Sequence, residues 1–124
     1  MIVLDTSSII DLLEGHSRGQ KVREKLENEA AAVSAITMHE ILVGVEDSQK
    51  RITQDFIKTV HVLAFDADAA YKSVLIEKSL ARKGKLIGKL DMLIAATCIV
   101  HDLPLLTSNT GFKHVEGLQL ITLS

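Results

Sequence analysis

The chain has 124 residues, of which 47% are hydrophobic and 3% aromatic, and its formal net charge is −2. This length predicts one domain, residues 1–124, with an aliphatic core, and the small net charge predicts no general affinity for nucleic acid, so such binding needs a local patch. The sequence contains no apolar run of the roughly 18 residues that span a membrane, and Asp5 comes too early for a signal peptide.

Five short apolar stretches predict β-strands. The first, residues 1–4, contains β-branched residues and is followed directly by Asp5, which is typical of a buried strand that delivers a carboxylate to its C-terminal end. The other predicted strands span residues 30–34, 61–65, 104–106 and 118–123.

Amphipathic or apolar stretches between these strands predict helices at residues 8–13, 19–29, 37–45, 48–59, 66–83 and 91–100. In the fifth, Asp66 and Asp68 suit a helix start, and one apolar stripe consists of Ala67, Ala70, Tyr71, Val74 and Leu75. The last carries no charge after Asp91, so we expect it to be buried nearly all round.

Strands that alternate with helices predict an α/β fold with a mainly parallel sheet. Cys98 lies within an apolar run of the last helix, where we expect a small core residue. A single cysteine cannot form an internal disulfide, which suits a reducing compartment, and we expect a cytoplasmic protein.

Three acidic residues each have a structural explanation. Asp5 could cap the helix that follows it, although Ser8 is an equally good cap. Thr37 and Glu40 match a capping box, in which the glutamate reaches back to the cap backbone. Asp91 precedes an apolar helix and could be its N-cap or a first-turn acid.

Taken together, these acids favour a metal site. Asp5 and Asn109 follow predicted strands, and Glu40 and Asp91 begin predicted helices, so all four lie towards the C-terminal edge of a parallel sheet, where ligands bind. Two carboxylates about 4 Å apart repel by roughly 4 kcal/mol at an effective dielectric near 20. A hard divalent cation removes this repulsion, and oxygen ligands favour Mg²⁺ or Mn²⁺. Asn109 could alternatively be a turn residue completed by Gly111.

Four motifs, in this order, resemble those of the PIN-domain family: Leu4-Asp5-Thr6-Ser7, Thr37-Met-His-Glu40-Ile-Leu-Val-Gly44, Leu90-Asp91-Met-Leu-Ile-Ala-Ala-Thr97 and Leu106-Thr107-Ser-Asn109-Thr-Gly-Phe112. The resemblance spans the whole chain and is greatest to VapC-type toxins. It implies a three-layer α/β/α fold with a mainly parallel five-stranded sheet. It also implies a Mg²⁺- or Mn²⁺-dependent endoribonuclease of a type II toxin–antitoxin pair, with RNA as substrate, a small antitoxin that covers the acidic cleft, and a homodimer.

The resemblance assigns roles to individual residues. The family's acidic metal ligands match Asp5, Glu40 and Asp91, and its supporting hydroxyls match Thr6 and Thr107. The fourth catalytic acid falls at Asn109, whose amide oxygen can hold a water or a metal but brings no charge. The further acid that often follows two residues later is replaced by Gly111.

A basic stretch leads directly to Asp91 and consists of Lys78, Arg82, Lys83, Lys85 and Lys89. These residues could form a solvated helix end, where cations are favourable. Alternatively, Arg82, Lys83, Lys85 and Lys89 bind RNA phosphates beside the metal, which gives affinity without sequence information.

Two other classes of protein compete with the nuclease. A binding module could keep the fold without turnover, with Asn109 marking the loss of an acid. A phospho-acceptor receiver domain also has acids at strand ends, but it needs an acidic pair after the first strand and a further Asp on a middle strand, for which Asp66 is misplaced.

Overall fold

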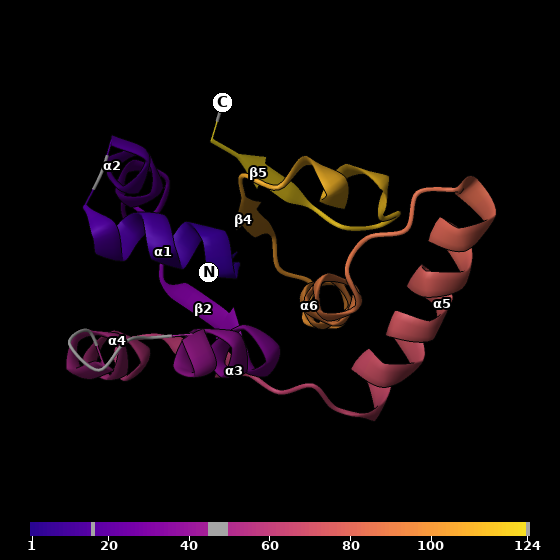
Figure 1. The fold of residues 1–124 in the computed structure, drawn as a ribbon, viewed down its shortest axis with the longest axis horizontal. Helices are drawn as coiled ribbons and strands as arrows, with labels where there is room; N and C mark the ends of the chain where they lie inside the picture. Colours follow the sequence, from indigo (N-terminus) through magenta and orange to yellow (C-terminus); the bar gives the residue numbers. More distant parts are fainter. Residues whose placement is uncertain (16, 45–49, 124) are drawn as a thin grey trace.

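A computed structural model describes residues 1–15, 17–44 and 50–123. Its centre is a five-stranded sheet in the order β3-β2-β1-β4-β5, in which every neighbouring pair is parallel. The strands are β1 (Ile2–Leu4), β2 (Ala31–Ser34), β3 (His61–Leu63), β4 (Leu105–Thr107) and β5 (Leu120–Thr122). The α/β prediction is therefore confirmed, and β1, the strand that ends directly before Asp5, lies in the middle of the sheet. Figure 1 shows its neighbours β2 and β4 on either side of the N-terminus.

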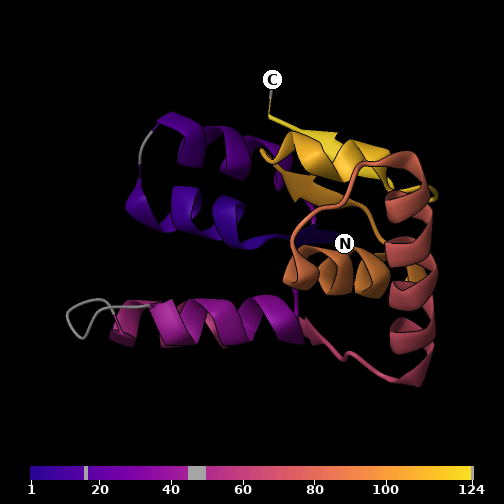
Figure 2. The same cartoon turned by 45° about the vertical axis from the view of Figure 1, so that its right-hand side comes forward.

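Helices cover both faces of the sheet (Figure 2). They are α1 (Thr6–Glu14), α2 (Ser17–Lys25), α3 (Ala35–Gly44), α4 (Lys50–Ile57), α5 (Ala67–Lys83) and α6 (Lys89–Val100), followed by the 3₁₀ helix η2 (Thr110–His114). Successive strand residues point to opposite faces of the sheet, so β1 contributes side chains to two hydrophobic cores. Val3 packs in one core with residues of α5 and α6, and Ile2 and Leu4 pack in the other with residues of α1, α2 and α3. The predicted three-layer arrangement is confirmed.

The last helix agrees with the prediction of a nearly fully buried element. From Met92 to Ile99 no residue of α6 is exposed. Cys98 is completely buried, as predicted, and burial raises the pKa of its thiol to about 12, so the thiol stays protonated and packs as an apolar group. Within the described ranges, no helix is both long enough and apolar enough to cross a membrane.

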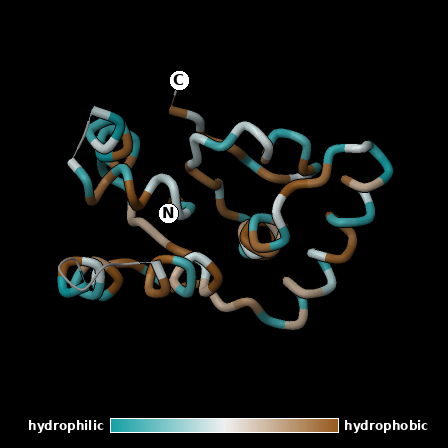
Figure 3. The backbone as a smooth tube through the Cα atoms, in the orientation of Figure 1, coloured by the Kyte–Doolittle hydropathy of each residue, from teal (hydrophilic) through white to brown (hydrophobic). Residues whose placement is uncertain are grey.

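The predicted stripe of α5 is wrong about which side faces the core. Tyr71, Val74 and Leu75 are 75%, 51% and 60% exposed. The buried face consists instead of Ala69, Ser73, Ile76 and Leu80. Figure 3 shows hydrophobic and hydrophilic residues mixed along the whole of α5. Since the helix has apolar residues on two sides, periodicity alone does not choose which side packs against the core.

Several predicted boundaries move. The helices that follow β1 and β2 start two residues earlier than expected, at Thr6 and Ala35. The reason is that the residue directly before each of these helices is its N-cap. The predicted strands at residues 61–65 and 118–123 are shortened to three residues each. The 3₁₀ helix η2 was not predicted. Residues 45, 48 and 49 of the predicted helices lie outside the described ranges.

Candidate active site

Asp5 lies at the C-terminal end of β1 and is both a helix cap and the centre of a polar network. Its Oδ1 accepts hydrogen bonds from the backbone N–H of Ser8 and the hydroxyl of Ser7, each at 2.9 Å, and its Oδ2 accepts one from the Thr107 hydroxyl. The residue is 5% exposed. Because a carboxylate offers about four lone-pair positions, these three donors fix its orientation and leave room for one further ligand.

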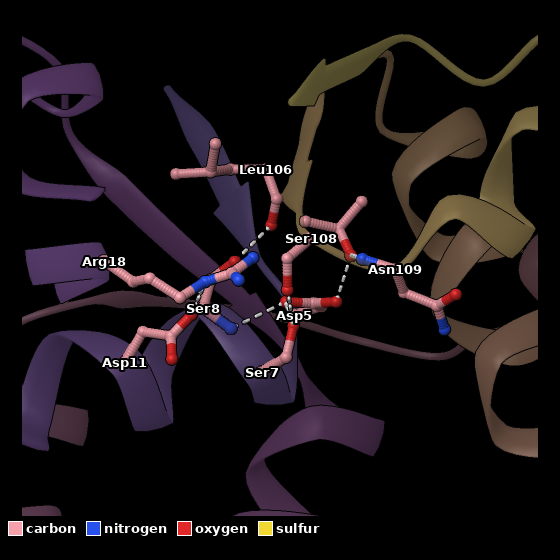
Figure 4. A network of polar contacts seen from close by, with 9 residues as sticks. Asp5, Ser7, Ser8, Asp11, Arg18, Leu106, Ser108 and Asn109 are labelled. Carbon is pink, nitrogen blue, oxygen red and sulfur yellow. Dashed lines mark hydrogen bonds and ion pairs between the residues drawn. The ribbon is translucent and has the colours of Figure 1, made fainter. Parts of the chain in front are cut away.

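The segment after β4 supports this network (Figure 4). Thr107 Oγ1 also accepts a hydrogen bond from the backbone N–H of Asn109 at 2.9 Å. The hydroxyls of Ser7 and Ser108 lie 3.3 Å apart, which links the ends of β1 and β4 a second time. The sequence analysis did not identify Ser7 and Ser108 as parts of the site. They could have been found because each lies within two residues of a predicted site residue at the end of a strand.

Asn109 has the predicted turn geometry. It caps η2, and its Oδ1 accepts a hydrogen bond from the backbone N–H of Gly111 at 2.9 Å. The side chain is exposed at the same edge of the sheet as Asp5. One lone pair of its amide oxygen is therefore used within the loop, and its catalytic role stays a prediction.

If Asp5 is a metal ligand of a ribonuclease, as the family resemblance implies, replacement of Thr107 by Val is expected to lower RNA cleavage by about 10- to 100-fold, the usual effect of removing a group that orients a metal ligand. Val has nearly the same shape but can neither donate to Asp5 nor accept from Asn109. Thr107→Ser keeps the hydroxyl and is the matched control, expected to retain most activity. Initial cleavage rates of a labelled RNA measure the difference. Equal activity of the Val variant and the parent would show that the Asp5 orientation does not need this bond.

Glu40 lies in the second turn of α3, so the predicted capping box at Thr37 is wrong. The cap is Ser34, whose hydroxyl accepts a hydrogen bond from the Thr37 backbone N–H at 3.0 Å. Glu40 is thereby free of a capping role, and its Oε1 accepts a hydrogen bond from the Thr6 hydroxyl at 2.7 Å. Thr6 is the first residue of α1, so this contact joins Glu40 to the end of β1, one residue from Asp5.

Asp91 is in the first turn of α6 and is half-buried. The cap of this helix is Gly88, so Asp91 is a first-turn acid and not the cap. Burial raises the pKa of the Asp91 carboxyl, and the negative charges of Glu40 and Asp5 raise it further. The three acids that lie far apart in the sequence therefore interact electrostatically at one edge of the sheet.

The donor chemistry of these carboxylates suits a hard divalent cation. In the described part of the chain, none of the three takes part in an ion pair, so their charges are uncompensated. Among the same residues, no three His, Cys, Asp or Glu side chains are already gathered as a metal centre. Ligation by all three acids thus needs a side-chain rotation or bridging waters, and Mg²⁺ commonly retains several waters in protein sites.

The predicted RNA-binding cations lie at the end of α5, in the following loop and at the start of α6, and all are exposed. Lys83 Nζ lies 2.7 Å from Glu116 Oε1, and Lys89 forms an ion pair with Glu77. Arg82 and Lys85 have no ion pair within the described residues. Two of the four positive charges are thus partly compensated, and the assignment of this patch to RNA stays a prediction.

Comparison with known proteins gives consistent matches over nearly the whole chain. Residues 2–118 match the family described as PIN domain. Ribonuclease VapC1 of Rickettsia felis is 35% identical, with 99% of this chain and 96% of the relative covered. A tRNA(fMet)-specific endonuclease VapC of Shigella flexneri is 30% identical, with coverage of 94% and 93%. A solved toxin–antitoxin complex from Klebsiella pneumoniae contains a chain with a TM-score of 0.79 and 27% identity, with coverage of 100% and 98%.

Proposed function

The chain belongs to the PIN-domain family, and we propose that it is a Mg²⁺- or Mn²⁺-dependent endoribonuclease, the toxin of a type II toxin–antitoxin pair acting in the cytoplasm. Relatives named as ribonucleases support the reaction class. The observation that carries the proposal is the environment of Asp91 at the edge of a parallel sheet: burial raises the pKa of its carboxyl, and the negative charges of Glu40 and Asp5 raise it further.

In this proposal Asp5, Glu40 and Asp91 hold the cation. A bound divalent ion lowers the pKa of a coordinated water and stabilises the charge that develops at phosphorus. Hydrolysis adds one water across a P–O bond of the RNA backbone. The protein supplies orientation: Thr107 and Ser7 hold Asp5, and Thr6 holds Glu40.

An antitoxin partner is part of the proposal because a toxin–antitoxin complex is among the structures similar to this chain. A groove of about 380 Å³ lies between α1, α3 and α4, and its walls include Ile9, Ile10, Leu13 and Ile41. Glu40 and its hydrogen-bond partner Thr6 also line this groove. An apolar antitoxin segment seated in this groove would therefore reach the acids and block RNA.

The competing candidate is a PIN-fold binding module without turnover. The observations that favour it are the uncharged Asn109, whose side-chain oxygen is already bonded to Gly111, and the absence of a ready-made metal centre in the described residues. Both candidates predict the same fold and the same partners, and they differ in metal binding and in cleavage.

RNA cleavage by purified protein separates them. We expect cleavage of RNA in Mg²⁺ or Mn²⁺ and its loss in EDTA, together with heat on titration of Mn²⁺ into the metal-free protein. The control is the same preparation with Asp5→Asn, which keeps the side-chain shape but removes the charge. Cleavage that persists in EDTA would overturn the metal dependence. No heat and no cleavage would favour the binding module.

A further inference from the structure

A pocket of about 370 Å³ lies beside the Asp5 network, between α2 and the segment that follows β4. Its walls include two cations of α2, Arg18 and Lys21, and the polar side chains of Ser108, Asn109 and Thr110. This pocket is separate from the groove between α1, α3 and α4, and it does not include the predicted RNA-binding patch around Arg82 and Lys85.

The charges of this pocket suit an anion. None of its lining residues is acidic, whereas the groove beside Glu40 contains two glutamates. Lys21 is exposed and has no ion pair within the described residues. Among the described residues Arg18 forms one ion pair, with its Nε 3.5 Å from Asp11 Oδ2, and its side chain remains 57% exposed. The other guanidinium N–H groups can therefore donate to a ligand.

The helix that carries both cations is held firmly in place. At Gly19, a side-chain β-carbon would lie 2.2 Å from the Asp11 carbonyl oxygen, so α2 approaches the backbone of α1 more closely than any other residue would allow. Val22, one turn later, is completely buried. Arg18 and Lys21 thus project from a rigid surface, which lowers the entropy cost of binding a ligand between them.

The pocket is continuous with the proposed reaction centre. Thr107 lines it and donates its hydroxyl hydrogen bond to Asp5. Ser108 also lines it, and its hydroxyl lies 3.3 Å from the Ser7 hydroxyl, which in turn donates to Asp5 at 2.9 Å. Figure 4 shows Arg18 on the α2 side of this network and Asn109 on the opposite side. A group bound in the pocket is therefore a close neighbour of a group bound at Asp5.

We propose that this pocket binds the RNA backbone phosphate next to the one that is cleaved, with Lys21 and Arg18 as the cations and Thr110 as a hydroxyl donor. Cations and hydroxyls on phosphate oxygens are the contacts that position a nucleic acid without reading its sequence. The inference rests on the proposed ribonuclease function, because it takes RNA as the ligand. It gives Lys21 a role in placing the substrate and none in the chemical step.

The test compares Lys21→Gln with Lys25→Gln. Both lysines are exposed and lie on α2, but Lys25 lines neither this pocket nor the groove between α1, α3 and α4. Binding of a fluorescent single-stranded RNA is measured in an Asp91→Asn background without metal, with the RNA checked for integrity on a gel. We expect Lys21→Gln to weaken binding about tenfold and to make the slope of log K against log salt shallower by about 0.7. Lys25→Gln should match the parent.

A neutral methylphosphonate at single positions of the same RNA locates the contact. At the linkage next to the cleavage site it should weaken binding to the parent but leave binding to Lys21→Gln unchanged, because both changes remove the same interaction. In cleavage assays with Lys21 replaced and Asp91 intact, KM should rise while kcat stays near that of the parent.

Parent-like affinity and salt slope for Lys21→Gln would overturn the inference, as would a parent that does not bind RNA. If Lys21→Gln weakens a complex with the antitoxin while RNA binding is unchanged, the pocket accommodates an acidic protein segment and the assignment to RNA is wrong. Failure of the ribonuclease proposal appears separately, as absence of cleavage by the parent in Mg²⁺ or Mn²⁺.

Discussion

Replacement of Asp91 by Asn is expected to lower RNA cleavage by about 10³-fold or more and, at the same time, to stabilise the metal-free protein. In the proposed site Asp91 is a metal ligand, and its loss lowers activity because a metal ion contributes several kcal/mol to transition-state stabilisation and about 1.4 kcal/mol corresponds to a factor of ten in rate. The gain in stability follows from the raised pKa of the Asp91 carboxyl, which burial and the charges of Glu40 and Asp5 cause.

The sign of the stability effect depends on pH. The usual pKa of this group is 3.8, and its value in the folded protein is higher. Well below pH 3.8 the carboxyl is protonated in both the folded and the unfolded protein, and it does not lower the free energy of unfolding. As pH rises from 3.8 through the folded-state pKa, the free energy of unfolding falls, and above the folded-state pKa the full loss is present. The Asn side chain does not ionise, so the free energy of unfolding of the variant does not fall in this way.

Urea unfolding in EDTA at acidic and at neutral pH measures the difference, which should grow with pH. Added Mg²⁺ should raise the stability of the parent and have less effect on the variant, because only the folded parent binds the ion well. Asp55→Asn is the control: Asp55 is an exposed acid of α4, and its replacement should change stability by less than about 0.5 kcal/mol. A parent that is more stable than Asp91→Asn at neutral pH without metal would contradict the proposed repulsion.

Replacement of Phe112 by Ala should destabilise the protein by about 3–5 kcal/mol. Phe112 lies in η2, is 1% exposed and belongs to the core on the α5 and α6 side of the sheet. Removal of its ring leaves a cavity beneath the segment that carries Asn109 and Thr110. Because domains of this kind are stable by only about 5–15 kcal/mol, this is a large share of the total, and urea unfolding measures it directly.

Tyr71→Ala is the matched control for Phe112→Ala. It removes another aromatic ring from a helix, but Tyr71 is 75% exposed. We expect a change of less than about 0.5 kcal/mol. If the Phe112 variant lost no more stability than the Tyr71 variant, the packing of η2 against the core would be incorrect.

The two capping arguments show where local sequence rules succeed and fail. Asp66 caps α5 as predicted, with its Oδ1 accepting from the Ala69 backbone N–H at 3.0 Å, because no competing cap precedes it. At α3 two hydroxyl residues compete, and Ser34 takes the cap position that Thr37 was expected to hold. A hydroxyl residue can cap a helix at either position, and the capping-box pattern favours Thr37; the choice depends on where β2 ends, which the sheet decides.

The sequence by itself determined the parallel α/β order and the chain positions of Asp5, Glu40 and Asp91, because strand and helix periodicity is local and strand ends of a parallel sheet meet at one edge. Only the tertiary structure decided which face of α5 is buried, which hydroxyls hold Asp5, and that Arg18 and Lys21 line a pocket beside it. These features join residues from separate elements, such as Asp5 and Thr107, so no local pattern encodes them. They follow from the close packing of α1 on α2 and of β1 on β4.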